Sequence, residues 1–211
     1  MNDKTDSSTG AGGGVVVGRG QRPHSASDLR THPSTGRLTG TVRERHAPLR
    51  GRVTKQSASC CIARLLVLAA EDPKNPIVAY IDSAGGSAGE SLSILSTMNG
   101  IRCPIVTFCR GTTGGPAVVI AAHGLRGFRV AAPNTRFSFK DFDFVGRAGK
   151  MTGKESFLPL LAEILSEDSH RPKEEFLELL AKGAEFNVQE AIRLGLIDQV
   201  SSKPILPPKA A

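Results

Sequence analysis

The sequence has 211 residues, enough for one domain of about 150–200 residues with a terminal extension. Its net charge of +7 is concentrated in residues 1–55, where ten of the 27 Lys and Arg residues stand against four acidic residues. The sequence has no apolar run of about 18 residues or more, and its N-terminus carries acids rather than an apolar core, so we expect neither a membrane-spanning helix nor a secretory signal.

The two ends of the sequence differ in composition from the middle. Residues 1–36 are rich in Gly, Ser, Thr and Arg, which predicts a disordered basic arm, and residues 203–211 form a Pro-rich tail. The arm offers few aromatic side chains to stack on bases and matches no nucleic-acid-binding module, so a nucleic-acid partner is not expected. Residues 37–202 are predicted to form a single folded domain.

The first half of this domain alternates helix and strand signals. Apolar residues that recur at i, i+3 and i+4 predict a helix over 57–71, which Asp72-Pro73 ends. A continuous apolar run over 77–81 is typical of a buried strand, and a Ser-Ala-Gly-Gly turn follows it. A second helix is predicted over 88–98, and a second buried strand over 105–109.

The second half continues the alternation. Its expected elements are a helix over 116–123, strands over 128–132 and 136–139, helices over 155–166, 172–182 and 188–194, and a short strand over 197–200. Helices and strands that alternate with short links predict an α/β fold, in which right-handed crossovers connect the strands of a parallel sheet.

The cysteines and glycines of the domain give no sign of a metal or cofactor. Four cysteines lie in apolar stretches, and none forms a C-x-x-C pair, which is typical of small core side chains in a reducing compartment. The cytoplasm is therefore the expected location, with an organelle stroma or matrix as the alternative. The Gly pairs at 85–86 and 114–115 lack the G-x-G-x-x-G spacing of a dinucleotide site. The cysteines are Cys60, Cys61, Cys103 and Cys109.

Residues 111–117 form a Gly-rich link between the strand over 105–109 and the next helix. Many hydrolases present their nucleophile at such a sharp strand-to-helix turn, where the following backbone N–H helps to bind an oxyanion. Here the apex residue is Gly115, which has no side chain, and the next residue is Pro116, which has no N–H. The link therefore has the position of an acyl-transfer site without its chemistry.

Four segments carry recognisable motifs: Ala70–Pro76 is similar to A-E-N-P-x-K, Tyr80–Gly86 to Y-I-N-S-P-G-G, Gly124–Arg136 to G-x-x-G-x-R-x-A-x-P-N-x-R, and Glu190–Asp198 to E-A-x-x-x-G-L-I-D. In this order and spacing they resemble the Clp protease proteolytic subunit family, ClpP, from about residue 45 to residue 200. The resemblance implies a ClpP/crotonase-like fold of repeated right-handed βαβ units, with a helical handle at about residues 150–182.

The resemblance also carries over the catalytic triad of the family, one position at a time. Its nucleophilic serine falls on Gly115, and its general-base histidine falls on Lys140. Its aspartate falls on Gly183 when counted back from Glu190. The segment between Lys140 and Glu190 is shorter than in the family, which leaves Glu185 as an alternative equivalent of the aspartate. All three positions of the triad are thus degenerate.

Of the two backbone donors that the family uses for the oxyanion, the resemblance keeps Gly86 and loses Pro116. Without a side-chain oxygen or sulfur there is no acyl-enzyme, and the loss of one oxyanion donor typically costs about 10²–10³ in rate. Lysine acts as a base only when its pKa is strongly depressed, and Lys140 has no hydroxyl at the apex to deprotonate. The resemblance therefore implies a pseudoenzyme.

Other side chains near these positions are candidates for relocated chemistry. Thr113 is a candidate nucleophile that would use Lys140 as its base, whereas the simpler role is a turn hydroxyl that caps the next helix. Ser138 shares a strand face with Lys140 by the period of two, and Ser83 belongs to the Gly-Gly turn. His123 lies near the end of a helix and is expected at the surface or at an interface rather than as a base.

Family members stack as two rings around a chamber, and Clp ATPases dock on the outer faces. The resemblance implies a non-catalytic, ClpR-type structural or regulatory subunit in a homo- or hetero-oligomeric ring, with a catalytic ClpP-type subunit and a Clp AAA+ ATPase as partners. Two alternatives stay open. One is a crotonase-like acyl-CoA-binding enzyme, which Gly114-Gly115 and the segment Arg129–Phe137 also resemble, and the other is a peptidase with a relocated Thr or Ser nucleophile.

Overall fold

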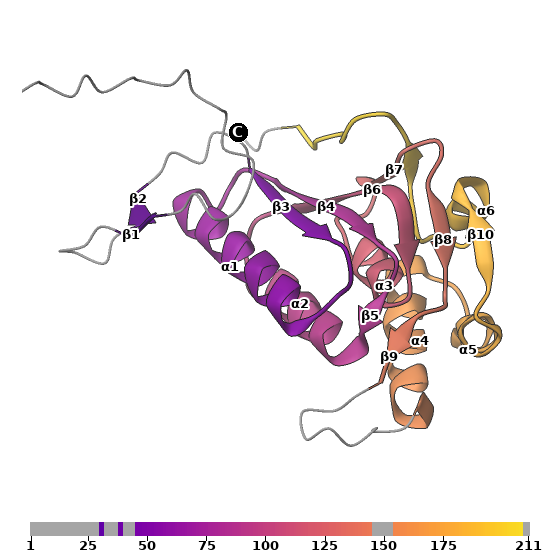
Figure 1. Cartoon of the computed structure of the whole chain (residues 1–211). Coiled ribbons are helices and arrows are strands. Elements are labelled where there is room, and N and C mark those ends of the chain that lie inside the picture. The colour runs from indigo at the N-terminus through magenta and orange to yellow at the C-terminus, as the bar shows by residue number, and fades with distance from the viewer. Residues whose placement is uncertain (1–29, 32–37, 40–44, 145–153, 209–211) are drawn as a thin grey trace, which may run out of the picture. The chain divides into compact units, whose positions relative to one another are not determined.

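The computed structural model describes residues 30–31, 38–39, 45–144 and 154–208. Residues 1–40 form a unit of their own, in which β1 (Arg30–Thr31) pairs antiparallel with β2 (Leu38–Thr39). Most of the predicted arm, and residues 150–153 at the start of the predicted handle, lie outside the described residues, so the disordered arm and the full extent of the handle stay predictions. The second unit, residues 41–211, contains the large sheet and the helices (Figure 1).

Among the described residues, the large sheet has seven strands: β3 (His46–Arg50), β4 (Ile77–Ser83), β6 (Ile105–Gly114), β7 (Arg129–Ala131), β8 (Arg136–Ser138), β10 (Glu185–Asn187) and β11 (Gln199–Val200). The order along its main path is β10-β8-β6-β4-β3, and β7 and β11 continue from β6 on a second path. The first part of β6 pairs with β7, whereas residues 112–114 pair with β8. The sheet therefore forks at β6, just before the Gly-rich turn.

One edge of the sheet differs from the prediction of a parallel sheet. β10 pairs antiparallel with β8, while the other pairs of this sheet are parallel. Two helices in contact, rather than a single crossover helix, lie between β8 and β10, so the chain returns in the opposite direction. Neither β3 nor β10 was predicted, because their sequences HAPLR and EFN are short and mix polar with apolar residues.

The six predicted helices are all present, with small shifts at their ends: α1 (Lys55–Glu71), α2 (Ala88–Gly100), α3 (Pro116–Ala122), α4 (Lys154–Ser169), α5 (Lys173–Lys182) and α6 (Val188–Arg193). From α1 to α5 each helix contacts the next, and α1 and α3 also contact the sheet. The start of α1 is fixed by a capping box, in which the side chains of Thr54 and Ser57 each accept a hydrogen bond from the backbone N–H of the other.

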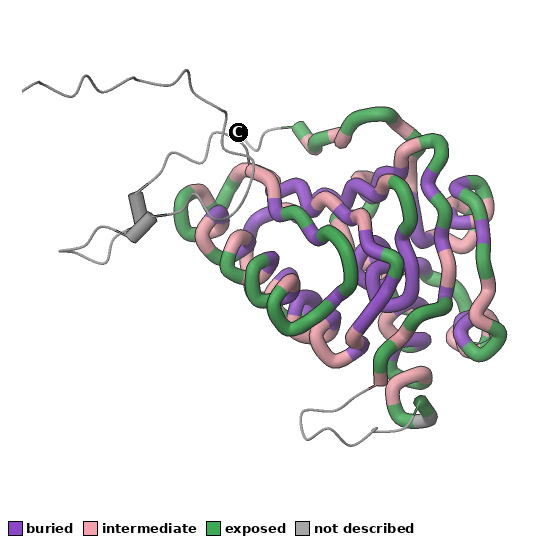
Figure 2. The backbone as a smooth tube through the Cα atoms, viewed as in Figure 1, coloured by how far each residue is buried: buried purple, intermediate pink, exposed green. Residues whose placement is uncertain are grey.

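Both faces of the central strands are buried, as the continuous apolar run over 77–81 predicts (Figure 2). One face packs against the helices in the main core. The opposite face forms a smaller cluster of Val78, Val106, Phe108 and Val130, against which Ile205 of the C-terminal tail packs. The described part of the tail, residues 203–208, has no regular secondary structure, yet it covers part of this sheet face.

The buried side chain of Arg129 forms hydrogen bonds that connect the ends of several elements. Arg129 is 2% exposed, and its Nε and Nη2 donate to Asp198 at 2.9 and 2.6 Å. Its Nη1 donates to the carbonyl oxygens of Ala122 and Asp168 at 3.1 and 3.0 Å, and the Gly127 N–H also donates to Asp198 at 2.7 Å. Burial by itself raises the pKa of Asp198, but these donors and the charge of Arg129 outweigh burial and hold the pKa below its ordinary value.

Candidate functional site

The Gly-rich turn forms a sharp elbow between β6 and α3. Gly115 lies at its apex with φ 50° and ψ −126°, a left-handed conformation that favours glycine. Pro116 is the first helical residue, where a missing N–H costs no helix hydrogen bond. The sequence thus builds the strand-to-helix elbow of a nucleophile site, but the apex has neither a side chain nor an N–H donor after it.

The chain that leaves β8 closes this apex. The Gly115 N–H donates to the Ser138 carbonyl oxygen at 2.8 Å. A Cβ atom on Gly115 would lie 2.6 Å from the Lys140 carbonyl oxygen and 3.0 Å from that of Asp141. A serine side chain at the apex would therefore require the backbone of residues 140–141 to move.

The Ser-Ala-Gly-Gly turn contacts the same segment. β5 (Gly86–Ser87) pairs parallel with β9 (Phe142–Asp143), a strand pair that the sequence did not predict. The Gly86 N–H, which is the oxyanion donor that the resemblance keeps, donates to the Asp141 carbonyl oxygen at 2.8 Å. Asp141 has a φ of 60°, a conformation that aspartate adopts more readily than most other residues. The donor is present, but a carbonyl group of the same chain occupies it.

Lys140 and Glu185 form an ion pair at the position that the resemblance gives to the base. Lys140 Nζ lies 2.6 Å from Glu185 Oε1, and the two side chains are 54% and 65% exposed. Their hydrogen bond and opposite charges raise the pKa of Lys140 and lower the pKa of Glu185. Gly183 is the left-handed residue that ends α5, and a Cβ there would lie 3.2 Å from Lys140 Cγ. The acid that pairs with residue 140 is therefore residue 185.

The hydroxyl groups near the elbow are buried or hydrogen-bonded to the backbone. Thr113 is completely buried, so a substrate has no access to it. Ser83 is 1% exposed, and its hydroxyl forms hydrogen bonds of 3.4 Å with the backbone of Gly85, within the turn itself. The Ser138 hydroxyl accepts a hydrogen bond of 3.5 Å from the Lys140 backbone N–H. The hydrogen bonds of Ser83 and Ser138 are therefore with the backbone of nearby residues rather than with a histidine.

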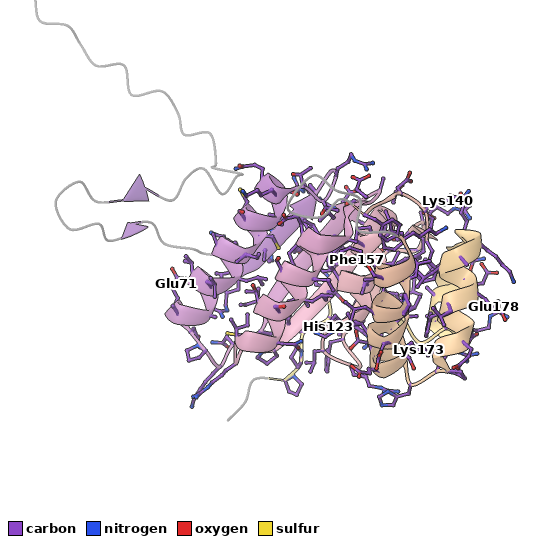
Figure 3. All side chains as sticks on the ribbon, turned by 90° about the horizontal axis from the view of Figure 1, so that it is seen from below. Glu71, His123, Lys140, Phe157, Lys173 and Glu178 are labelled. Atoms are coloured by element: carbon purple, nitrogen blue, oxygen red, sulfur yellow. The ribbon has the colours of Figure 1, made fainter. Side chains whose placement is uncertain are left out.

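His123 belongs to a separate polar cluster at the ends of three helices. Its Nδ1 lies 2.8 Å from Asp168 Oδ2 on α4, and its Nε2 lies 2.9 Å from Asn99 Oδ1 on α2. The side chain of His123 is 17% exposed, and the expectation that it lies at the surface or at an interface stays a prediction. Figure 3 shows His123 well apart from Lys140, so it is not placed to serve the elbow as a base.

The cysteines are free thiols, and three of the four are buried as predicted. Cys60 is exposed because neighbouring helical positions point in different directions, and Cys61 takes the core side of α1. Burial raises the pKa of Cys61 and Cys109 to about 12, so neither is a thiolate at neutral pH. Within the described ranges, no group of three or more His, Cys, Asp or Glu side chains is placed to hold a metal ion, and no helix is long and apolar enough to cross a membrane.

Comparison with known proteins assigns this fold to a family. Residues 33–141, just over half of the chain, match the family model of Clp protease. The crystal structure of the ClpP protease catalytic domain from Plasmodium falciparum is similar with a TM-score of 0.65 and 29% sequence identity, over 76% of this chain and 86% of that one. The predicted ClpP-like α/β fold is confirmed. The chain belongs to the Clp protease family.

Proposed function

We propose that this protein is a non-catalytic, ClpR-type subunit of a Clp-type protease, which shapes or regulates the complex rather than cleaving peptides. A serine peptidase needs a nucleophile, a base that takes its proton, and donors for the oxyanion. The observation that carries the proposal is the ion pair of Lys140 and Glu185 beside an apex, Gly115, that has no side chain. The site therefore has no group to attack a peptide bond.

The charge state of Lys140 argues against its use as a base. A lysine takes a proton only in its neutral form, which a depressed pKa makes available. Here the carboxylate of Glu185 favours the charged form, and the side chain of Lys140 is 54% exposed, so burial does not offset that effect. Lys140 stays protonated at neutral pH.

The same geometry counts against the two alternative functions. An acyl-CoA enzyme of the crotonase type would need two free backbone N–H donors to hold a thioester enolate. Pro116 has no N–H, and the Gly86 N–H is bonded to Asp141. A relocated peptidase centre on Thr113 would need that hydroxyl to reach a substrate, and the residue is completely buried.

The proposed partner is a catalytic ClpP-type subunit. Members of the Clp protease family generally form oligomeric rings, which supports a ring for this chain. A subunit without a nucleophile contributes to proteolysis only beside one that has it, so we place this chain in a mixed ring that a Clp AAA+ ATPase feeds. The location of the protein, cytoplasm or organelle stroma or matrix, would follow that of its partner.

Two measurements test this function. The purified protein is treated with a serine-directed fluorophosphonate probe, with a catalytic ClpP-type paralogue as the positive control, and we expect label on the paralogue alone. Stoichiometric labelling of the isolated protein would end the pseudoenzyme proposal. A tagged copy is then purified from its source, and we expect the catalytic paralogue to co-purify at a fixed ratio. A ring that contains this chain alone would replace the mixed ring with a homomeric, structural one.

A further inference from the structure

The segment Lys140–Asp143, here called the strap, crosses both glycine turns of the degenerate site. We infer that the strap is an internal occupant that closes this site through its backbone, independently of the missing triad side chains. The inference rests on the proposed function, because it concerns the regulation of the same site. It adds that the site is filled by the chain itself rather than merely lacking its reactive groups.

The strap contacts both glycine turns through its backbone. The Asp141 carbonyl oxygen accepts the Gly86 N–H at 2.8 Å, so it takes the donor that would otherwise bind an oxyanion. A Cβ on Gly115 would lie 2.6 Å from the Lys140 carbonyl oxygen, and a Cβ on Gly85 would lie 2.7 Å from the Cβ of Asp141. Glycine at the two turns therefore leaves the space that the strap fills.

Contacts at both ends hold the strap in place. At its start, Lys140 pairs with Glu185 on β10. At its end, Asp143 pairs with Arg52 at 2.8 Å, and Phe142 stacks on Phe144 with ring centroids 5.5 Å apart. The Phe144 ring in turn lies 5.9 Å from the ring of Phe157 on α4. The strap is thus connected to the sheet on one side and to the helical layer on the other.

Closure by the chain itself has a thermodynamic consequence. A segment tethered next to its site is present at a high effective concentration and loses little freedom when it binds. Any added ligand that uses the Gly86 N–H must first displace Asp141. Restoring a serine, a histidine and an aspartate at the triad positions would therefore leave the oxyanion donor occupied.

Asp141 is the residue through which the strap can be opened selectively. Glycine readily adopts its φ of 60°, whereas the proline ring locks φ at about −65°. The experiment measures amide hydrogen exchange of Gly86 in the full chain, in Asp141→Gly and in Asp141→Pro. We expect protection in the first two proteins and exchange at least about tenfold faster in Asp141→Pro, with the amides of α1 and α3 unchanged.

Exchange of the Gly86 amide at one rate in all three proteins would overturn the inference. If Asp141→Pro also exposes the amides of α1 and α3, Asp141→Val takes its place, because a β-branched residue resists positive φ without removing an N–H. Fluorophosphonate labelling of the same samples separates the two proposals. Labelling would overturn the pseudoenzyme and leave the strap, whereas equal exchange without labelling would overturn the strap and leave the pseudoenzyme.

Discussion

Two ion pairs with the same separation behave differently in this protein. Arg129 Nη2 lies 2.6 Å from Asp198 Oδ1, and Lys140 Nζ lies 2.6 Å from Glu185 Oε1. The first pair is 2% and 17% exposed, whereas the second is 54% and 65% exposed. Arg129 also donates to two backbone carbonyl groups, and Asp198 accepts backbone N–H groups. Distance alone therefore does not tell what an ion pair contributes.

The difference separates a buried pair, on which the fold depends, from an exposed pair beside the elbow. A buried charge whose partner is removed stays unpaired in a low dielectric, so the fold depends on both members of the pair. An exposed pair is screened by water, and removal of one member leaves the other solvated. Arg129 and Asp198 lie in two of the segments that resemble the family motifs, whereas Lys140 stands at the position that the resemblance gives to the base.

The largest effect is expected when the buried pair is broken. Asp198→Ala leaves the Arg129 guanidinium buried without its carboxylate, and we expect a loss of about 3–5 kcal/mol in the free energy of unfolding. Urea unfolding followed by circular dichroism measures this loss. The matched control is Glu185→Ala at the exposed pair. A loss for Asp198→Ala no larger than that of the control would remove the distinction between the two pairs.

A second substitution tests whether the degenerate site has a structural cost of its own. Gly115→Ser places a side chain at positive φ and against the Lys140 carbonyl oxygen, and we expect a loss of about 2–4 kcal/mol without gain of fluorophosphonate reactivity. Gly51→Ser is the control, because Gly51 also has positive φ but has no atom within 4 Å of the added Cβ. Its expected loss is about 1 kcal/mol, from backbone strain alone. Equal losses of stability in the two variants would show that the Lys140 carbonyl oxygen does not restrict a side chain at position 115.

The sequence predicts the helices and strands that have a periodic apolar pattern. It does not predict contacts between residues that are far apart in the chain. The helices and the buried strands follow from apolar spacing, and the elbow follows from Gly115 and Pro116. Glu185 could only be left as an alternative to Gly183 for the equivalent of the aspartate, and its pairing with Lys140 was not predicted, because the two residues are 45 positions apart. The strand pair β5–β9 has two residues on each side, too few to show any alternation. The contact of Asp141 with Gly86 has no sequence signal either.

A smaller loss of stability is expected at low pH, and it should come from the buried pair. The pKa of Asp198 is lowered in the folded protein, so the stability it contributes is present above its unfolded pKa, about 3.9, and is lost as the pH falls through the lower folded value. We expect constant unfolding midpoints between about pH 7 and 5 and a decrease below about pH 4. Asp198→Asn should flatten this decrease, and Glu185→Gln should flatten it much less, because water screens the exposed pair. If Glu185→Gln alone flattened the decrease, the exposed pair rather than the buried pair would be the source of the acid sensitivity.

The smallest effect is expected when the exposed pair is removed. Lys140→Met and Glu185→Gln each leave a solvated partner, so we expect unfolding midpoints close to that of the wild-type protein at moderate salt. The Lys140→Met variant should also remain unreactive toward fluorophosphonate, since the apex has no nucleophile in either protein. Midpoints that fall as far as in Asp198→Ala would mean that the pair stabilises β10 or the strap. Lys140 would then be a structural residue rather than a surface charge.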